Sequence, residues 1–206
     1  MGEKQMIISV GREFGSGGHV IAEKLAKEFG LPLYDHNLLR EIAGEKDFDA
    51  QLLEKYDEVP KNRLISRTVN GYSNSPSENI AKMQFDFLKG KAESGESFVV
   101  VGRCSEKVLK GYPGLITIFI LGDMEAQIQR IMEVDDLSRD EAKELIRKKD
   151  KKRKTYHNYY SEGKWGDSRN YDLSINSSRL GIDETVEAVI DYIKRRQRIS
   201  AVSFFS

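Results

Sequence analysis

The chain has 206 residues, 39% of them hydrophobic and 9% aromatic, a composition typical of one ordinary globular domain with a sizeable core. Basic and acidic residues number 33 each, so no net charge directs the chain toward nucleic acid or an anionic membrane. No apolar run approaches the roughly 18 residues that a membrane span needs, and the first residues lack the pattern of a signal peptide. The single cysteine, Cys104, excludes an internal disulfide. We therefore expect one cytoplasmic domain over residues 1–206 that binds neither nucleic acid nor membrane.

The first elements alternate between strand and helix. Residues 6–11 are apolar and β-branched, which indicates a buried strand. After a glycine-rich turn, apolar residues recur at helical spacing until a glycine and a proline end the helix. Residues 31–35 are expected to form a second short strand. Residues 36–96 are mostly polar and are predicted to be helical in pieces, with a loop signal over residues 69–79.

The second half of the chain continues the alternation. Residues 97–103 and 115–121 have the apolar pattern of two further buried strands, and residues 171–178 that of a last strand. Helices are expected after the last two of these strands and over the charged stretch between them. The expected helix caps are Asp123, Ser138 with Glu141 as a capping box, and Asp183.

Buried strands separated by helices predict an α/β fold with a parallel, doubly wound sheet. In such sheets ligands bind beyond the C-terminal ends of the strands. Four features of the sequence are expected to meet at that edge. They are the loop at residues 11–19, Asp35, Arg103 and the polar segment after Ile120.

The loop at residues 11–19 has the glycine content of a phosphate-binding turn. Such a turn directs backbone N–H groups at a phosphate, and the helix that follows adds partial positive charge. The Walker pattern G-x-x-x-x-G-K-[ST] is not met, because alignment on Gly17 puts Gly18 at the lysine position and His19 after it. The dinucleotide pattern G-x-G-x-x-G is not met either. The alternative is a tight turn without a ligand. The expected cofactor-binding residues are Gly15, Ser16, Gly17, Gly18 and His19.

Two cations of this loop can compensate for the missing lysine. Arg12 lies on its first limb, from which the side chain can reach the β- or γ-phosphate. His19 lies in the first turn of the helix, where it either contacts phosphate or faces solvent. The sequence thus raises the question of whether the site transfers phosphate with rearranged charges or has lost that activity.

Three separated motifs, in this order, resemble the cytidylate kinase-like P-loop proteins, in the branch that lacks the lysine. The motifs are "ISVGREFGSGGHVIAEKLAKEFGLPLYD" at 8–35, "VVVGRC" at 99–104 and "WGDSRNYDLSINSS" at 165–178. This resemblance covers nearly the whole chain. It implies a P-loop three-layer sandwich, in which a five-stranded parallel sheet carries helices on both faces. It also implies ATP and Mg²⁺ as cofactors, a nucleoside monophosphate as substrate, an acceptor-binding segment at 36–96 and a lid at 150–168.

The candidates on the acceptor side lie at or after strand ends. Asp35 either ligates Mg²⁺ through water or orients the acceptor, and the alternative to both is that it caps a helix. Arg40 resembles the arginine that holds the acceptor phosphate in cytidylate kinases, although the spacing differs by one, and a surface ion pair is the alternative. Arg103 directly follows a buried strand, so its planar guanidinium is expected to face the active edge and to suit phosphate.

Residues 147–160, "RKKDKKRKTYHNYY", form the most charged run. By itself such a run is typical of a solvated helix face or a nucleic-acid patch. Its place before the last strand favours a lid, in which Lys149 and Arg153 share one helix face. They resemble the lid arginines that neutralise charge in the transition state. Asp150 is a candidate for orienting them, and Arg130 on the preceding helix is a further candidate for substrate binding.

The aromatic residues of the lid are expected to pack it rather than to stack on a base; they are Tyr156, Tyr159, Tyr160 and Trp165. Because its charges repel one another and bury little apolar surface, the segment is also expected to be more mobile than the sheet. No cluster of histidine and cysteine in the sequence indicates a structural metal, and no metal-binding residue is predicted.

Three functions remain open at this point. The leading hypothesis is a kinase that uses ATP and Mg²⁺ to phosphorylate a nucleoside monophosphate, with CMP as the acceptor that the resemblance implies. The second is a non-catalytic protein that binds a nucleotide or another anion, which the missing lysine favours. The third is a kinase of another small metabolite, because residues 36–96 show no acceptor pattern.

Overall fold

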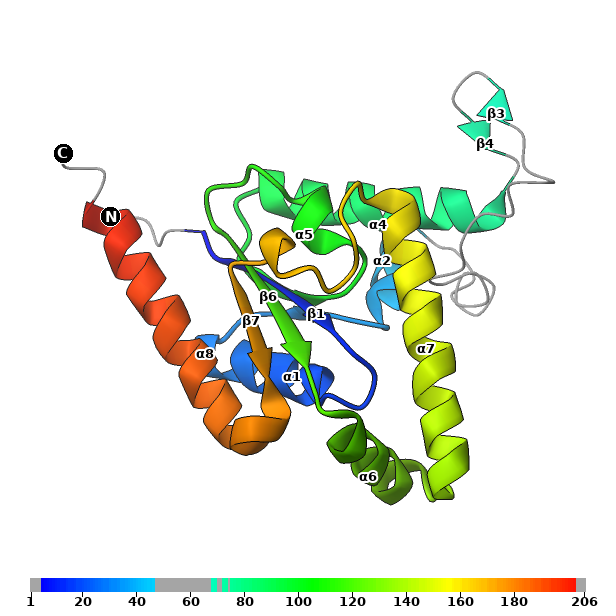
Figure 1. Ribbon diagram of the computed structural model, residues 1–206. Coiled ribbons are helices and arrows are strands. Elements are labelled where there is room, and N and C mark those ends of the chain that lie inside the picture. Colours follow the sequence, from blue (N-terminus) through cyan, green and yellow to red (C-terminus); the bar gives the residue numbers. More distant parts are fainter. Residues whose placement is uncertain (1–4, 47–67, 70–71, 74, 203–206) are drawn as a thin grey trace.

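The computed structural model describes residues 5–46, 68–69, 72–73 and 75–202 (Figure 1). The strands are β1 (Ile7–Arg12), β2 (Leu33–Tyr34), β3 (Thr68–Val69), β4 (Tyr72–Ser73), β5 (Phe98–Val101), β6 (Leu115–Leu121) and β7 (Leu173–Asn176). The helices are α1 (Gly18–Phe29), α2 (Leu38–Lys46), α4 (Pro76–Glu93), α5 (Ser105–Val108), α6 (Met124–Asp135), α7 (Arg139–Tyr160) and α8 (Ser177–Val202), with a 3-10 turn η1 (Ser168–Asn170). None of the described helices is long and apolar enough to cross a membrane.

Five of the strands form one sheet in the order β2-β5-β1-β6-β7. Every neighbouring pair is parallel, and the central β1 places Ile7 between Phe98 of β5 and Leu115 of β6. The predicted doubly wound parallel sheet is thus confirmed. Because all five carboxyl ends lie at one edge, the segments that follow them meet there.

Alternate residues of the strands feed two cores, one on each face of the sheet. One core packs α1 and α8 against the sheet, through Ile21, Leu25, Val189 and Ile193. The other packs α2 and α4 against the opposite face, through Leu38, Leu39, Ile80 and Leu88. Figure 1 shows α1 and α8 below the sheet, α4 and α5 above it, and α6 and α7 beside the carboxyl end.

The predicted N-cap residues of α6 and α7 occupy the expected positions, but only that of α7 makes the expected capping hydrogen bond. Ser138 and Glu141 form the expected capping box of α7. Asp123 occupies the N-cap position of α6, but among the described residues its side chain makes no capping hydrogen bond. Instead it accepts from Asn176 and pairs with Arg179, which ties the start of α6 to the end of β7.

The last strand is shorter and the last helix longer than the sequence predicts. Helical turns begin at Ser177, directly after β7, and the axis then kinks at Gly181, where φ is 77°. The Ser177 hydroxyl lies 3.2 Å from the carbonyl of Leu121, at the point where β7 gives way to α8. The predicted cap Asp183 pairs with Lys24 on α1.

The polar segment at residues 36–96 contains helices, as predicted, where the structure describes it. Within the expected loop at 69–79, Ser75 is the N-cap of α4 and Pro76 is its first residue, a position that tolerates proline because no N–H is needed there. Much of the rest of this segment lies outside the described residues.

Candidate active site

The glycine loop turns sharply from β1 into α1. Gly15 and Gly17 have φ values of 79° and 76°, which lie in the left-handed region that glycine adopts without a steric penalty. Gly17 is the N-cap of α1, and no side chain of the described residues caps that end. One N–H of this turn, that of Gly18, is directed at the Ser16 hydroxyl at 3.3 Å. The start of α1 otherwise offers backbone N–H groups and the positive end of the helix dipole to an anion.

Polar side chains from distant elements fix the backbone of this loop. The Ser16 hydroxyl donates to the Glu13 carbonyl at 2.8 Å, and the Ser177 hydroxyl donates to the Ser16 carbonyl at 2.6 Å. The Glu13 carboxylate accepts from the Gly122 N–H at 3.0 Å and from the Gln127 amide at 2.9 Å. Sequence reasoning missed Glu13, Gln127 and Ser177 as supports of this loop, because their bonds join residues more than 100 positions apart.

Arg12 fills the space beside Gly18. A Cβ atom added at Gly18 would lie 2.5 Å from the Cβ of Arg12 and 3.3 Å from the Cβ of Ile120. Carbon atoms do not approach so closely, so no side chain fits at position 18 unless Arg12 moves. Arg12 therefore stands in the space from which a Walker lysine would extend.

Arg103 follows β5 in a strained turn. Gly102, Arg103 and Cys104 all have positive φ, with values of 74°, 59° and 52°. Two consecutive non-glycine residues in this region are unusual, and such conformations concentrate at functional sites. The Arg103 side chain is buried, and its Nη2 donates to the Asp35 carbonyl at 3.4 Å. The turn thus directs a guanidinium toward the end of β2.

The basic helix α7 contacts the glycine loop through its inner face. The Phe14 N–H donates to Asp150 Oδ1 at 2.8 Å. Lys149 and Arg153 both lie over the Phe14 ring, with cation-to-centroid distances of 5.9 and 5.4 Å, within the range of cation–π contacts. Arg153 also donates to the Arg12 carbonyl at 3.4 Å. The shared helix face is confirmed, and Asp150 Oδ1 lies 3.8 Å from Arg153 Nη1.

Two residues near the C-terminal end of α7 are buried, contrary to the expectation that this segment buries little apolar surface. Tyr156 is 3% exposed and His157 is 4% exposed. His157 Nε2 lies 2.6 Å from Glu106 Oε1 in a buried pair. Trp165 packs edge-on against Phe119 at a centroid distance of 5.5 Å. The expectation was wrong at these positions because Tyr156 is buried and the half-buried ring of Trp165 packs on Phe119, as the expected packing role of the aromatic residues implies.

Three of the predicted arginines line one small cavity between these elements. It measures about 20 Å³, and its lining includes Arg12, Arg103, Arg153 and Glu106. A volume of this size admits about one water molecule and is too small for a nucleotide. The structure thus brings together three guanidiniums from three elements, with α7 closed over them.

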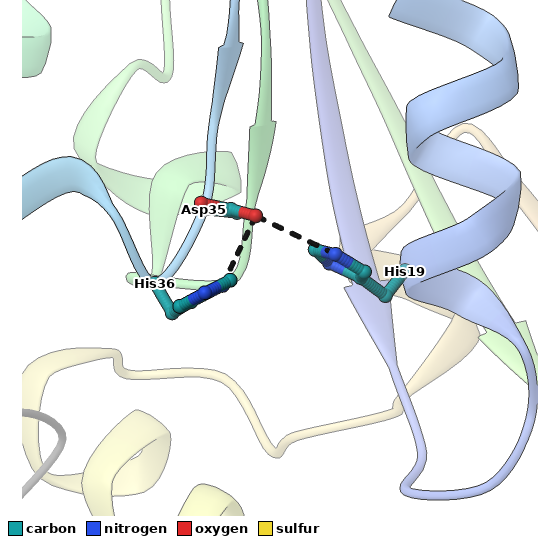
Figure 2. Close-up of side chains that lie close together, drawn as sticks. All are labelled: His19, Asp35 and His36. Carbon is teal, nitrogen blue, oxygen red and sulfur yellow. Dashed lines mark ion pairs between the residues drawn. The ribbon is translucent and has the colours of Figure 1, made fainter. Parts of the chain in front are cut away.

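Asp35 lies at the end of β2 with its two carboxylate oxygens engaged differently (Figure 2). Its Oδ1 accepts from the Asn37 N–H at 2.8 Å, just before α2. Its Oδ2 lies 3.5 Å from His19 Nε2 and 3.1 Å from His36 Nδ1. The cap-like bond and a functional use of Asp35 are therefore compatible, because each uses a different oxygen.

Two predicted substrate-binding arginines lie away from the cavity lining. Arg130 Nη1 donates to the Gly15 carbonyl at 2.5 Å, so Arg130 supports the glycine loop from α6. Arg40 is exposed near the start of α2. The roles of both in substrate binding stay predictions.

Comparison with known proteins shows which sequences this chain is similar to. The sequence model described as "Cytidylate kinase-like family" matches residues 7–179, which include the glycine loop, Arg103 and Arg153. A cytidylate kinase from Methanopyrus kandleri is 28% identical over 200 residues, with 93% of this chain and 96% of that protein covered.

Solved structures agree on the architecture. An uncharacterized protein from Eubacterium ventriosum is 40% identical, with a TM-score of 0.73 over 92% of this chain and 99% of that one. The shikimate kinase of Acinetobacter baumannii, solved in complex with shikimate, is 14% identical, with a TM-score of 0.55 over 94% of this chain and 96% of that one. The latter likeness extends to the fold and no further.

Proposed function

This chain belongs to the cytidylate kinase-like family, and from that premise we propose that it is an ATP-dependent phosphotransferase acting on a nucleoside monophosphate with a CMP-like base. One observation carries the proposal. Arg12, Arg103 and Arg153 converge on one cavity from the end of β1, the end of β5 and the lid helix α7. Phosphoryl transfer requires little beyond positioning and charge stabilisation, and three guanidiniums beside a glycine loop supply both.

Each arginine has a distinct task in this proposal. Arg12, which stands where a Walker lysine would extend, holds the terminal phosphate of ATP. Arg103, which is bonded to the end of β2, faces the acceptor phosphate. Arg153 closes over the transferring phosphoryl group with α7 and neutralises charge that develops in the transition state.

ATP is expected to arrive with Mg²⁺ bound to its phosphates. Mg²⁺ prefers an octahedral set of oxygen ligands, whereas the residue after the lysine position is His19, beside Asp35 and His36. This donor set does not fit a Mg²⁺ ion held directly by the protein. In this proposal the arginines neutralise the negative charge of the phosphates, and the protein does not hold Mg²⁺ directly.

The missing lysine favours a second candidate, a protein that binds a nucleotide without turnover. A coupled assay of ADP release distinguishes the two, using CMP, other nucleoside monophosphates and small hydroxylated acids as acceptors. We expect CMP-dependent ADP release. Turnover with a hydroxylated acid alone would favour a small-metabolite kinase. ATP-induced thermal stabilisation without turnover on any acceptor would favour the binder.

A further inference from the structure

The folded chain creates a cluster that its sequence spacing does not reveal. His19 comes from the first turn of α1, and Asp35 and His36 follow β2. In Figure 2 the three side chains point toward one another across the gap between these elements. One potential ligand atom from each residue lies within 4.8 Å of the other two, the only such group of histidine, cysteine and acidic side chains in the described part of the chain.

The distances within the cluster suit a metal ion. Asp35 Oδ2 lies 3.1 Å from His36 Nδ1 and 3.5 Å from His19 Nε2. Ligands at about 2.0–2.2 Å from a tetrahedral Zn²⁺ ion are separated from one another by roughly 3.4 Å. The two measured distances lie on either side of that separation, and all three potential ligand atoms lie within 4.8 Å of one another, so small side-chain shifts suffice to place them around one ion.

The surroundings of Asp35 prepare it as a ligand. The residue is 5% exposed, and the Asn37 N–H fixes its Oδ1 at 2.8 Å. Such a second bond orients a ligating carboxylate. The side chains of His19 and His36 are 41% and 71% exposed, so a bound ion would keep positions open to solvent.

We propose that His19, Asp35 and His36 form a binding site for a divalent transition-metal ion of the Zn²⁺ or Co²⁺ class. Imidazole nitrogens with one carboxylate select such ions over Mg²⁺ and Ca²⁺, which require oxygen ligands. The position of His19 in the glycine loop also supports a metal site. His19 stands at the position where the Walker motif has a serine or threonine whose hydroxyl holds a metal ion. Metal binding itself does not depend on the kinase activity proposed above.

One neighbouring group competes with the ion. Glu23 Oε1 lies 3.2 Å from His19 Nε2, so in the metal-free protein this nitrogen is shared between Glu23 and Asp35. Binding of the ion requires His19 to leave Glu23. Glu23 therefore offers a matched control: a carboxylate that touches the cluster without belonging to it.

The test is a Co²⁺ titration of the chelator-treated full-length chain without nucleotide, followed by visible d–d absorption. We expect saturation at one Co²⁺ per chain and displacement by Zn²⁺. His19→Ala, Asp35→Asn and His36→Ala should each weaken Co²⁺ binding by about tenfold or more, with unchanged circular dichroism. Glu23→Gln removes the competitor for His19 and should therefore leave the Co²⁺ affinity equal to or higher than that of the wild type.

Several outcomes would overturn the proposal. They are the absence of a saturable Co²⁺ spectrum in the wild type, binding that survives loss of both histidines, and a loss in Glu23→Gln as large as in Asp35→Asn. Because the readout contains no nucleotide, a negative kinase assay would leave the metal result intact, and a negative metal result would leave the kinase proposal intact.

Discussion

The glycine loop and the helix α7 bring positive charge to the same cavity, but they are held in opposite ways. The loop is fixed by buried hydrogen bonds from Ser16 and Ser177. The inner face of α7 reaches that loop through the Asp150 bond to Phe14 and through long cationic side chains. The loop is therefore a rigid donor site, whereas α7 has contacts that can break and form during a catalytic cycle. Residues on α7 should consequently affect turnover, and residues on the loop should affect binding as well.

The largest effect is expected at Arg153, on the α7 side of this comparison. Arg153→Ala should lower kcat by roughly 100-fold or more, since arginine fingers contribute about 10³–10⁵-fold, and leave the Kd for ATP within a few-fold. The reason is that an interaction made mainly in the transition state appears in kcat. Steady-state kinetics with an independent ATP-binding measurement would check it.

Lys149 is the matched control on the same helix face. Lys149→Ala should have a smaller effect, because an ammonium group makes a point contact where a guanidinium can hold two oxygens. Weakened ATP binding with unchanged kcat in Arg153→Ala would instead make Arg153 a ground-state anchor. If neither quantity changed, the basic run would be a solvated helix face.

A smaller effect, on the rigid side, is expected at Arg12. Arg12→Ala should lower turnover by more than about tenfold, because loss of a charge-stabilising donor at a transferring group has this order of effect or more. It should also weaken ATP binding, unlike Arg153→Ala. Turnover and ATP affinity would both be measured, with thermal melting to confirm the fold.

The contact between Arg12 and Gly18 offers a reciprocal test. Gly18→Lys alone should disrupt the site, because its Cβ would meet that of Arg12. The double variant Arg12→Gly with Gly18→Lys removes the two closest contacts and leaves the one to Ile120 Cβ at 3.3 Å, and the lysine restores the charge. Recovery of activity above the Arg12→Gly single variant is expected. Full activity of Gly18→Lys or of Arg12→Ala would contradict the assignment.

The smallest effect concerns the pH dependence of the contact between Asp150 on α7 and the Phe14 N–H in the glycine loop. Burial raises the pKa of the Asp150 carboxyl to about 6, although the Phe14 N–H and Arg153 act in the opposite direction. A raised pKa means that this group stabilises the fold fully below its unfolded-state pKa near 4, and that the contribution is lost as the pH rises through about 6. The unfolding free energy of the wild type minus that of Asp150→Asn should therefore fall between these limits.

The size of that change is on the order of 1 kcal/mol after allowance for solvent screening. Urea unfolding of both proteins at a series of pH values would measure it. If the difference in unfolding free energy stays constant across the series, or rises with pH, the pKa of the Asp150 carboxyl is not raised in the folded protein.

The fold was predictable because its signal is local. The three inner strands β1, β5 and β6 are largely apolar runs, such as residues 115–121, and their burial follows from that composition. Arg103 was predictable for the same reason, since the residue after an inner strand must lie at the active edge. The proposed role of Arg103 in catalysis stays a prediction.

The rest of the site depended on contacts between distant residues. Glu13 looks like an ordinary loop acid until Gly122 and Gln127 are brought to it. His19 and His36 are 17 positions apart, and only the return of the chain from α1 to β2 places them around Asp35. The buried pair of His157 and Glu106 was hidden by the charges that surround His157 in the sequence.

The contact between Gly18 and Arg12 also limits how this protein can evolve. A mutation that introduces a lysine at position 18 meets the Arg12 side chain, and a mutation that removes Arg12 takes away a cation before another is present. Each single step is expected to lower fitness if the site is used, although the two changes together are compatible. The arginine and the lysine arrangements would then be separate peaks of an epistatic landscape, and a lineage that holds one of them has no smooth route to the other.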